Sequence, residues 1–124
     1  MITGVGTDII EVRRIRLAIA RHNGFIARVF TPAESEYCLS GGNSTQRFAG
    51  RFAAKEAVAK SLGTSLTWHD VEILADASGK PIVRLLNQAA ALANGGKVMV
   101  SISHCRTYAV AYAVAEDREE DLRR

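Results

Sequence analysis

Large and small side chains alternate strictly between residues 108 and 115, and this alternation constrains the fold more than any other feature of the sequence. The large positions are Tyr108, Val110, Tyr112 and Val114, and alanine follows each of them. Successive residues of a β-strand point to opposite faces of a sheet, so the segment predicts a strand with one large face and one uniformly small face. A small face lets a helix approach closely, and the alanine-rich residues 53–59 are the natural candidate for that helix.

The rest of the chain contains shorter elements. Residues 46–62 are rich in Ala, Lys, Glu and Arg and are followed by Gly63, which predicts the longest helix and its C-terminal cap. Thr31, Pro32 and Glu34 predict an N-cap, a first-turn proline and a capping-box acid for a short helix. The other predicted elements are a strand over 1–11, a helix over 11–22, a loop over 40–45, strands over 71–74 and 82–85 about a turn at 78–81, a short helix over 87–93, and a strand over 98–103 that forms a hairpin with 108–115.

These elements predict an α+β fold, in which a mostly antiparallel sheet packs on one long helix. The chain has 124 residues, and a kinase or a (β/α)₈ barrel needs roughly 250. We expect a single domain over residues 1–115 with a modest core. Residues 116–124 contain five acids and three bases, which predicts a charged, solvated C-terminal tail.

Positive charge concentrates in the first quarter of the chain. The formal net charge is +3, and 12 of the 16 basic residues are arginine. Five arginines and no acid lie between residues 11 and 34. On a helical wheel Arg14, Leu17, Ala18 and Arg21 share one side, which is therefore cationic with an apolar centre. Arginine makes bidentate contacts to phosphate and carboxylate, so this surface predicts an anionic partner.

Cysteine usage and hydropathy bear on location. Cys38 and Cys105 are too few and too irregularly placed for a disulfide scaffold or a zinc cluster. The first residues lack the charged start and cleavage site of a signal peptide, and no apolar run approaches about 18 residues. We therefore expect a cytoplasmic protein with reduced thiols and no membrane association.

Asp8 is an acid inside an apolar strand. Val5, Ile9 and Ile10 surround it in the sequence, and a carboxylate buried there is costly unless a cation or hydrogen-bond donors meet it. One interpretation is a strand-end acid paired with an arginine. The other is a functional acid.

The long predicted helix carries a row of like charges. Arg47, Arg51 and Lys55 recur at every fourth residue, and such neighbours repel one another by about 0.3 kcal/mol per pair. This row is explained if something anionic lies along the helix.

Glu56 and Lys60 share the same spacing on that helix, which by itself indicates an ordinary surface ion pair. The alternative is that Glu56 and Asp8 bind Mg²⁺ together, since this ion favours one or two carboxylates with waters and substrate phosphates. Arg51, Lys55 and Lys60 would then contact the phosphate oxygens that the metal does not reach.

His104 follows a predicted strand, and a lone histidine in a turn is usually just exposed; the functional alternative is an anion contact. A nucleophilic role for the adjacent Cys105 is disfavoured, because neighbours on an extended strand point to opposite faces. Neither a GxxxxGK[ST] loop nor a complete dinucleotide-binding turn occurs. The residues alone therefore support a Mg²⁺–phosphate site whose substrate is undetermined.

Four segments carry a more specific signal. They are GVGTDIIEV at residues 4–12, RFAAKEAVAK at 51–60, HDVEILADASGKPIV at 69–83, and SISH at 101–104 followed by the alternating strand. In this order and at these spacings they resemble the holo-[acyl-carrier-protein] synthase family, the small bacterial type of 4′-phosphopantetheinyl transferase. The resemblance covers most of the chain and implies the fold of that family.

The resemblance also implies an activity. Members transfer the 4′-phosphopantetheine group of coenzyme A to a serine of apo acyl carrier protein, with Mg²⁺, in fatty acid biosynthesis. The products are holo acyl carrier protein and adenosine 3′,5′-bisphosphate. Family members are homotrimers with active sites between subunits, which implies the same assembly here.

Individual roles follow from the same resemblance. It implies that Asp8 and Glu56 are the Mg²⁺ ligands and that Lys60 is the active-site lysine near the pyrophosphate. The implied coenzyme A contacts are Arg51, Lys60, Gly63, Ser65 and His104, with His104 near the 3′-phosphate and Ser65 in the place of a family glycine. The implied contacts with acyl carrier protein are Arg14, Leu17, Ala18, Arg21 and Phe25.

Three points stay open at the level of sequence. The base that receives the serine proton is Glu56, a metal-bound hydroxide or a carboxylate of the partner. A small RNA-binding module is the rival from another class, although the few aromatic residues and a pI near 9.1 disfavour nucleic acid as a partner. An inactive structural paralogue is disfavoured because Asp8, Glu56 and Lys60 are all present.

Overall fold

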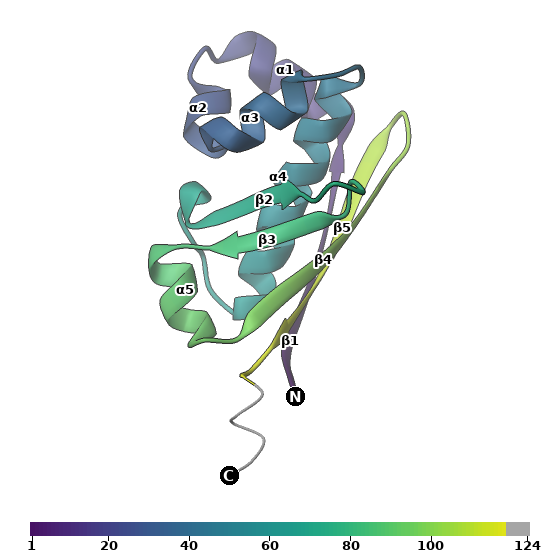
Figure 1. The fold of residues 1–124 in the computed structure, drawn as a ribbon. Helices are drawn as coiled ribbons and strands as arrows, with labels where there is room; N and C mark the ends of the chain where they lie inside the picture. Colours follow the sequence, from purple (N-terminus) through teal and green to yellow (C-terminus); the bar gives the residue numbers. More distant parts are fainter. Residues whose placement is uncertain (119–124) are drawn as a thin grey trace.

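The computed structural model describes residues 1–118, and its elements surround one long helix (Figure 1). In chain order they are β1 (Ile2–Glu11), α1 (Val12–Arg21), α2 (Phe25–Val29), α3 (Pro32–Leu39), α4 (Ser44–Leu62), the 3₁₀ turn η1 (Trp68–Asp70), β2 (Val71–Ala75), β3 (Pro81–Leu85), α5 (Asn87–Ala93), β4 (Lys97–His104) and β5 (Tyr108–Glu116). The strands form an antiparallel sheet of order β1-β5-β4 and a separate hairpin, β2–β3. This is the α+β arrangement that the sequence predicts.

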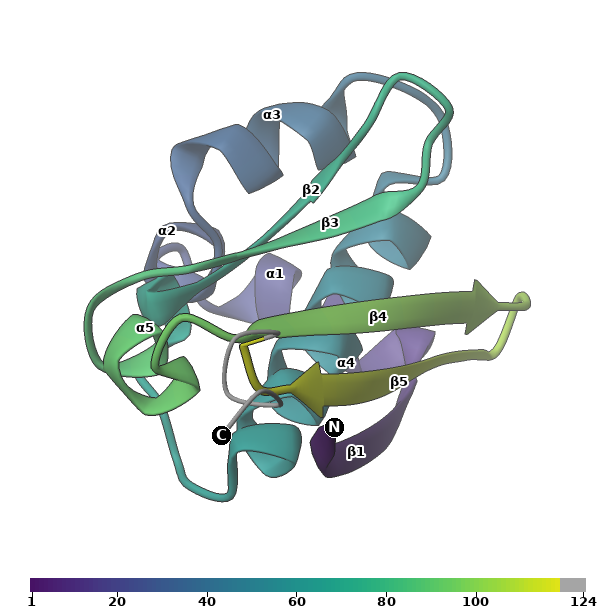
Figure 2. The same ribbon diagram turned by 60° about the horizontal axis from the view of Figure 1, so that its bottom comes forward.

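The alternating strand is β5, at the centre of the three-stranded sheet. Its four alanines are buried, as are Ala53 and Ala57 of α4, whereas Tyr108, Val110 and Tyr112 are exposed on the opposite face. The predicted small face therefore does pack on the long helix. The hairpin β2–β3 crosses α4 at an angle to the sheet, so α4 is enclosed from two sides (Figures 1 and 2).

Two glycines set the spacing between β1 and α4. Gly4, Gly6 and Asp8 occupy alternate positions of β1 and face the helix. A Cβ atom at Gly4 would overlap the carbonyl oxygen of Ser61, and one at Gly6 would overlap the carbonyl oxygen of Ala57. Only glycine allows this approach, and it carries Asp8, the next inward position, to the surface of α4.

The helices α1, α2 and α3 cover a second core at one end of α4. The predicted capping box is confirmed at α3: the N–H of Glu34 donates to Thr31 Oγ1 at 3.2 Å, and Glu34 Oε1 accepts from the N–H of Thr31 at 2.8 Å. The sequence indicated no helix over α2. This single turn buries Phe25 and Val29, and a five-residue segment is too short to display helical periodicity.

The chain ends of the described part lie together. β5 continues through Glu116, and the amino group of Met1 donates to Asp117 Oδ1 at 2.9 Å. The rest of the predicted tail, residues 119–124, lies outside the described residues. No helix within residues 1–118 is both long enough and apolar enough to cross a membrane.

Candidate active site

Asp8, Glu56 and Lys60 lie together where β1 meets α4. Lys60 Nζ donates to the carbonyl oxygen of Thr7 at 2.9 Å and contacts Asp8 Oδ1 at 3.4 Å. The Asp8 side chain is 19% exposed and that of Lys60 is 55% exposed, so solvent and ligands can reach both. The cation that meets Asp8 is thus a lysine of the long helix and not an arginine.

The two carboxylates affect one another. Partial burial raises the pKa of Glu56, and the negative charge of Asp8 raises it further, while Lys60 lowers it. Two acids that repel each other while one nearby lysine neutralises part of their charge form a site that favours a bound cation. No cluster of three or more His, Cys, Asp or Glu side chains suited to a metal occurs within residues 1–118.

A cavity of about 650 Å³ adjoins these residues. Its α4 side includes Glu56, Ala59 and Lys60, and the opposite side is formed by the chain that leaves the helix, residues 63–71. Gly63 has φ +82° and closes α4 through bonds from its N–H to the carbonyl oxygens of Ala59 and Lys60, which confirms the predicted cap. Gly63 and Ser65, two of the expected coenzyme contacts, therefore line the same cavity as Lys60.

Lys55 does not play the role that the sequence indicated. Its side chain is 2% exposed, and Nζ lies 2.7 Å from Glu34 Oε1. It also donates to the carbonyl oxygens of Trp68 and Val71. The expectation that Lys55 contacts a phosphate is therefore wrong, because all its donors are used inside the protein. Burial lowers its pKa, and the Glu34 charge offsets part of that effect.

The row of like charges on α4 faces helix α3. Arg47 donates to the carbonyl oxygen of Tyr37 at 3.0 Å, and the Arg51 guanidinium lies 4.3 Å from the centre of the Tyr37 ring. Lys55 completes the row against Glu34. The row therefore faces electron-rich groups of the protein itself, namely a carbonyl oxygen, the face of an aromatic ring and a buried carboxylate.

Arg51 and His104 lie in a different cavity, of about 340 Å³, together with Arg47, Gln46 and Tyr37. Arg51 is 6% exposed, and its Nε is buried without a hydrogen-bond partner within residues 1–118. Nine residues separate Arg51 from Lys60 on α4, which corresponds to about 14 Å along the helix. One chain therefore does not bring Arg51 and His104 to Asp8 and Glu56.

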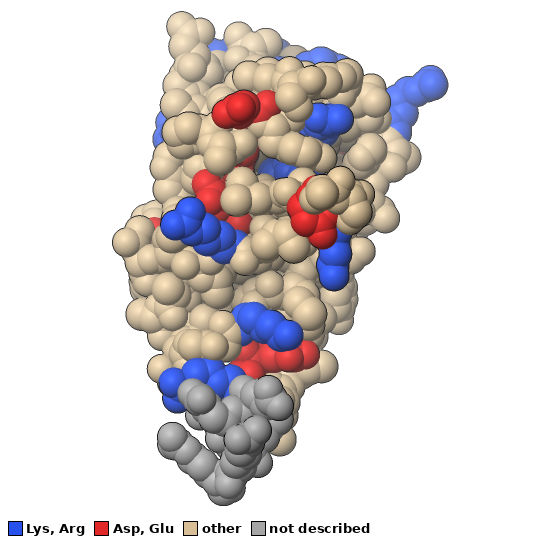
Figure 3. All heavy atoms as spheres, viewed as in Figure 1, with Lys and Arg blue, Asp and Glu red and all other residues tan. Residues whose placement is uncertain are grey.

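The expected docking residues divide between surface and core. Arg14, Leu17, Ala18 and Arg21 line one shallow depression on α1. On the face shown in Figure 3, basic side chains at this end of the molecule are scattered among acidic and uncharged ones. Phe25 is 9% exposed, and its ring lies 6.2 Å from that of Phe30, centre to centre. Helix α2 turns most of this ring into the second core, and the expected contact of Phe25 with a partner protein stays a prediction.

Two features of the site were missed by sequence reasoning. Glu34 was recognised only as a capping acid, although its Oε2 also accepts from the N–H of Ile73 at 2.7 Å and its Oε1 binds Lys55. Trp68 had no assigned role, and it lines the larger cavity. The sequence offered one hint of the role of Glu34: its partner Lys55 directly precedes Glu56 in the segment RFAAKEAVAK.

Comparisons with known proteins agree on one family. A sequence profile described as 4′-phosphopantetheinyl transferase superfamily matches residues 4–113. The holo-[acyl-carrier-protein] synthase of Alkaliphilus oremlandii is 47% identical over 121 residues, which cover 93% of this chain and 99% of that protein. The corresponding protein of Koribacter versatilis is 44% identical and is covered completely, over 94% of this chain.

Solved structures give the same result. The fold matches a crystal structure of a holo-(acyl-carrier-protein) synthase from Bacillus anthracis in complex with CoA (3′,5′-ADP), with a TM-score of 0.81, 37% identity, and coverage of 95% of this chain and 99% of that one. It also matches the Helicobacter pylori holo-[acyl-carrier-protein] synthase in complex with coenzyme A, with a TM-score of 0.81, 27% identity, and coverage of 90% and 99%.

Proposed function

Because this chain belongs to the 4′-phosphopantetheinyl transferase superfamily, within its holo-[acyl-carrier-protein] synthase group, we propose that it transfers the 4′-phosphopantetheine arm of coenzyme A to a serine hydroxyl of apo acyl carrier protein. The products are holo acyl carrier protein and adenosine 3′,5′-bisphosphate. The observation that carries the proposal is the meeting of Asp8, Glu56 and Lys60 beside the cavity of about 650 Å³.

The residues present fit a magnesium ion. Asp8 and Glu56 would hold it, because both supply oxygen donors, and burial together with the negative charge of Asp8 raises the pKa of Glu56, a cost that a cation would relieve. When bound, the metal would neutralise charge on the pyrophosphate of coenzyme A. Two protein carboxylates leave coordination positions for substrate oxygens, as phosphoryl transfer requires.

Lys60 would take up charge that develops on the leaving phosphate. Its side chain is more than half exposed and is held toward Asp8 by the carbonyl oxygen of Thr7, so a substrate oxygen can reach Nζ without unfolding any contact of the core. Phosphoryl transfer depends on such positioning and charge neutralisation more than on covalent help from the protein.

The second cavity supports the other half of a coenzyme A site. Arg51 has a buried, unpartnered Nε within the described part of the chain, and Arg47 and His104 add further nitrogen donors. These groups suit the 3′-phosphate of the coenzyme. Within one chain these groups lie far from Asp8 and Glu56, so we propose that a neighbouring subunit supplies them.

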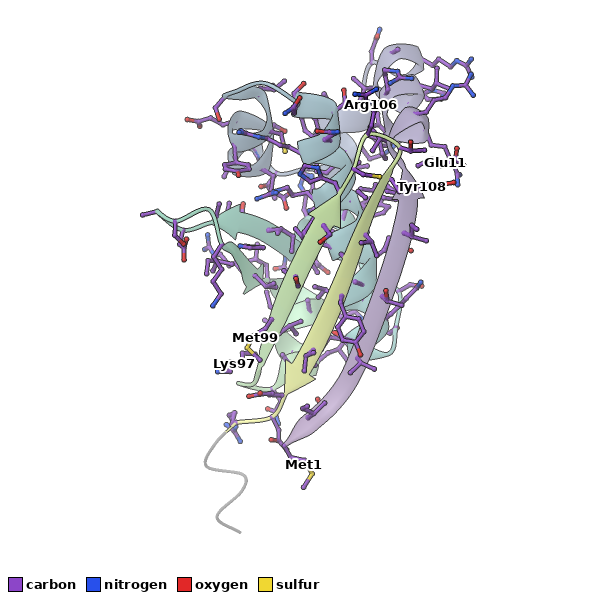
Figure 4. All side chains as sticks on the ribbon, turned by 90° about the vertical axis from the view of Figure 1, so that its right-hand side faces the viewer. Met1, Glu11, Lys97, Met99, Arg106 and Tyr108 are labelled. Atoms are coloured by element: carbon purple, nitrogen blue, oxygen red, sulfur yellow. The ribbon has the colours of Figure 1, made fainter. Side chains whose placement is uncertain are left out.

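The outer face of the three-stranded sheet supports this assembly as a homotrimer. Val5 and Ile9 of β1 and Val110 and Tyr112 of β5 are exposed there, and Ile9 pairs with Val110 across the two strands. Figure 4 views the three strands from this face. A contiguous apolar face of this kind is unusual on a monomer and marks an interaction surface. A trimer that buries this face could set the first cavity of one subunit against the second cavity of the next.

Helix α1 supports recognition of the carrier protein. Arg14 and Arg21 are exposed on one side of the helix, with the half-buried Leu17 and Ala18 between them. Acyl carrier proteins are acidic, so this cationic surface would speed and orient the encounter while the centre adds a small apolar contact.

The pathway that the proposed reaction serves is fatty acid biosynthesis. The two free thiols fit a cytoplasmic location, which cell fractionation would test.

Mass spectrometry tests the proposed reaction directly. Apo acyl carrier protein incubated with this protein, coenzyme A and Mg²⁺ should gain about 340 Da, the mass of the transferred arm. EDTA should abolish the gain, and excess Mg²⁺ should restore it. An unchanged mass with a correctly folded carrier protein would contradict the proposed function.

A further inference from the structure

The cavity beside Glu56 has a wall with few attachments to α4. We define the cavity wall as residues 64–71, which run from the end of α4 to the start of β2 and supply Thr64, Leu66, Trp68 and Val71 to the lining. Its near end is held by the N–H of Thr64, which donates to the carbonyl oxygen of Ala59. Between Ser65 and Thr67, no hydrogen bond to α4 occurs within the described part of the chain.

Lys55 attaches the far end of this wall. Its Nζ donates to the carbonyl oxygen of Trp68 at 2.8 Å and to that of Val71 at 2.6 Å. The third acceptor is Glu34 Oε1 at 2.7 Å. The Trp68 ring also packs on Phe52, with ring centres 5.0 Å apart. The hydrogen bonds of His69 and Asp70 join the wall to Ala27, Leu86 and Asn87, which lie outside α4.

The position of Lys55 connects this attachment to the reacting groups. Lys55 immediately precedes Glu56 on α4, and both line the cavity. A shift of the wall therefore changes the width of the cavity directly opposite Glu56 and Lys60. A wall that is free to shift weakens binding, because the ligand must then supply the free energy that orders it.

We propose that Lys55 is a positioning residue for coenzyme A: its two bonds to the carbonyl oxygens of Trp68 and Val71 hold the cavity wall at the distance from α4 that the coenzyme requires. This inference rests on the proposed function for the identity of the ligand. A purely structural ion pair with Glu34 would instead affect stability alone.

Two variants separate these roles. Lys55→Met keeps the length and apolar stem of the side chain and removes every donor. Glu34→Gln removes the charge of the partner, yet Lys55 keeps its donors to both carbonyl oxygens, since even an uncharged amine has two N–H groups. Both variants disturb the buried ion pair, but only the first removes the bonds from α4 to the carbonyl oxygens of Trp68 and Val71.

Trp68 is the single tryptophan of the chain, so its fluorescence reports on the wall without labelling. For Lys55→Met we expect easier quenching by acrylamide and a rise of about tenfold in the Kd and KM for coenzyme A, as loss of one or two hydrogen bonds would produce. The kcat at saturating coenzyme A should change far less. Glu34→Gln should lower the melting temperature while quenching and Kd stay close to those of the unmodified protein.

Unchanged quenching and Kd in Lys55→Met would overturn the inference, and so would equal weakening of coenzyme A binding by both variants. If Lys55→Met does not fold, the double variant Lys55→Met, Glu34→Gln replaces it and is compared with Glu34→Gln alone, because it removes both buried charges and keeps a side-chain oxygen as an acceptor for the backbone N–H groups around Glu34. The same two outcomes then decide. Failure of the unmodified protein to modify carrier protein would contradict the proposed function instead, and is measured separately.

Discussion

At the scale of single residues, orientation around α4 determines what a charged side chain does. Lys55 and Lys60 belong to the same helix, yet the first is buried against Glu34 and the second is open to solvent beside Asp8. Five residues correspond to a rotation of about 140° around the helix axis, so the two lysines face different surroundings. Residue type and spacing alone did not show that Lys55 is a buried structural residue and that Lys60 is available to bind a substrate.

The carboxylates of the site give the first prediction. Asp8→Asn and Glu56→Gln should each lower Mg²⁺-dependent transfer by at least about 100-fold, because each removes an anionic oxygen ligand while keeping the shape of the side chain. Neither should lower the melting temperature, since burial and the charge of Asp8 both raise the pKa of Glu56, and relief of these costs offsets the lost attraction to the exposed Lys60. The rate is measured by carrier-protein modification at saturating coenzyme A.

Glu36→Gln is the matched control, since Glu36 is an exposed glutamate on α3 without a place at the site. It should transfer at the unmodified rate. Full activity in either Asp8→Asn or Glu56→Gln would remove that carboxylate from the proposed metal site.

The two free thiols should differ in reactivity. Burial raises the pKa of Cys38 to about 11, whereas hydrogen bonds from the backbone N–H groups of Tyr108 and Thr107 lower the pKa of the exposed Cys105. At pH 8 we expect iodoacetamide to alkylate Cys105 rapidly and Cys38 only after denaturation, because the thiolate is the reactive form. Peptide mapping by mass spectrometry measures both. Comparable rates in the folded protein would contradict the burial of Cys38.

At the scale of elements, the contact between β1 and α4 assembles the site. Gly6→Ala places a methyl group where the carbonyl oxygen of Ala57 lies, so strand and helix must separate. We expect a loss of about 2 to 3 kcal/mol in the free energy of unfolding, typical of overpacking, and a loss of transfer activity because Asp8 moves away from Lys60. Denaturant unfolding and the transfer assay measure the two effects.

Gly24→Ala is the control for this prediction. Gly24 has φ −90° and no atom within 4 Å of an added Cβ, so the same substitution should be close to neutral there. If Gly6→Ala were equally neutral, the close approach of β1 to α4 would not be a requirement of the fold.

Helix α1 gives a prediction about the partner. Arg14→Glu and Arg21→Glu should each raise the KM for acyl carrier protein several-fold and leave the KM for coenzyme A nearly unchanged, because they reverse charge on the docking surface and not at the cavity. The increase should be smaller at high salt. Equal effects on both substrates would refute the assignment of α1 as the docking surface.

Lys97→Glu is the charge-matched control for α1. Lys97 begins β4 at the opposite end of the sheet from Glu11, the residue that precedes α1 (Figure 4). Its reversal makes the same change in net charge, so it should leave the KM for carrier protein unchanged if position matters and overall charge does not.

At the scale of the whole molecule, the two cavities are separate within one chain, which is the basis for proposing that a second subunit completes the site. Co-expression of Glu56→Gln with Arg51→Ala tests this. In randomly mixed trimers about a quarter of the interfaces should combine an intact Glu56 with an intact Arg51 from the neighbour, so activity should reappear although each variant alone is inactive. A mixture as inactive as its components would contradict a site shared between subunits.

Tyr112→Glu extends this test to the sheet face. A charge among the exposed apolar residues of β1 and β5 should yield a monomer by light scattering and abolish transfer, while the isolated subunit keeps its helical and strand content. A variant that remains trimeric, or a monomer with full activity, would show that another surface forms the assembly.

The sequence by itself determined the elements of this protein and the family to which it belongs. The alternating strand, the capping box at Thr31 and Glu34, the cap at Gly63 and the hairpin β2–β3 all follow from interactions between residues close in the chain, which a pattern can record. Helix α2 was not predicted because a five-residue segment is too short to show helical periodicity.

The tertiary structure alone decided which side chains are internal and which are available to ligands. It buried Lys55 and Phe25, paired Asp8 with Lys60, and placed Arg51 and His104 apart from that pair. The reason is physical, because burial and electrostatic partners depend on residues that are distant in sequence, such as Glu34 for Lys55, and local periodicity carries no information about them.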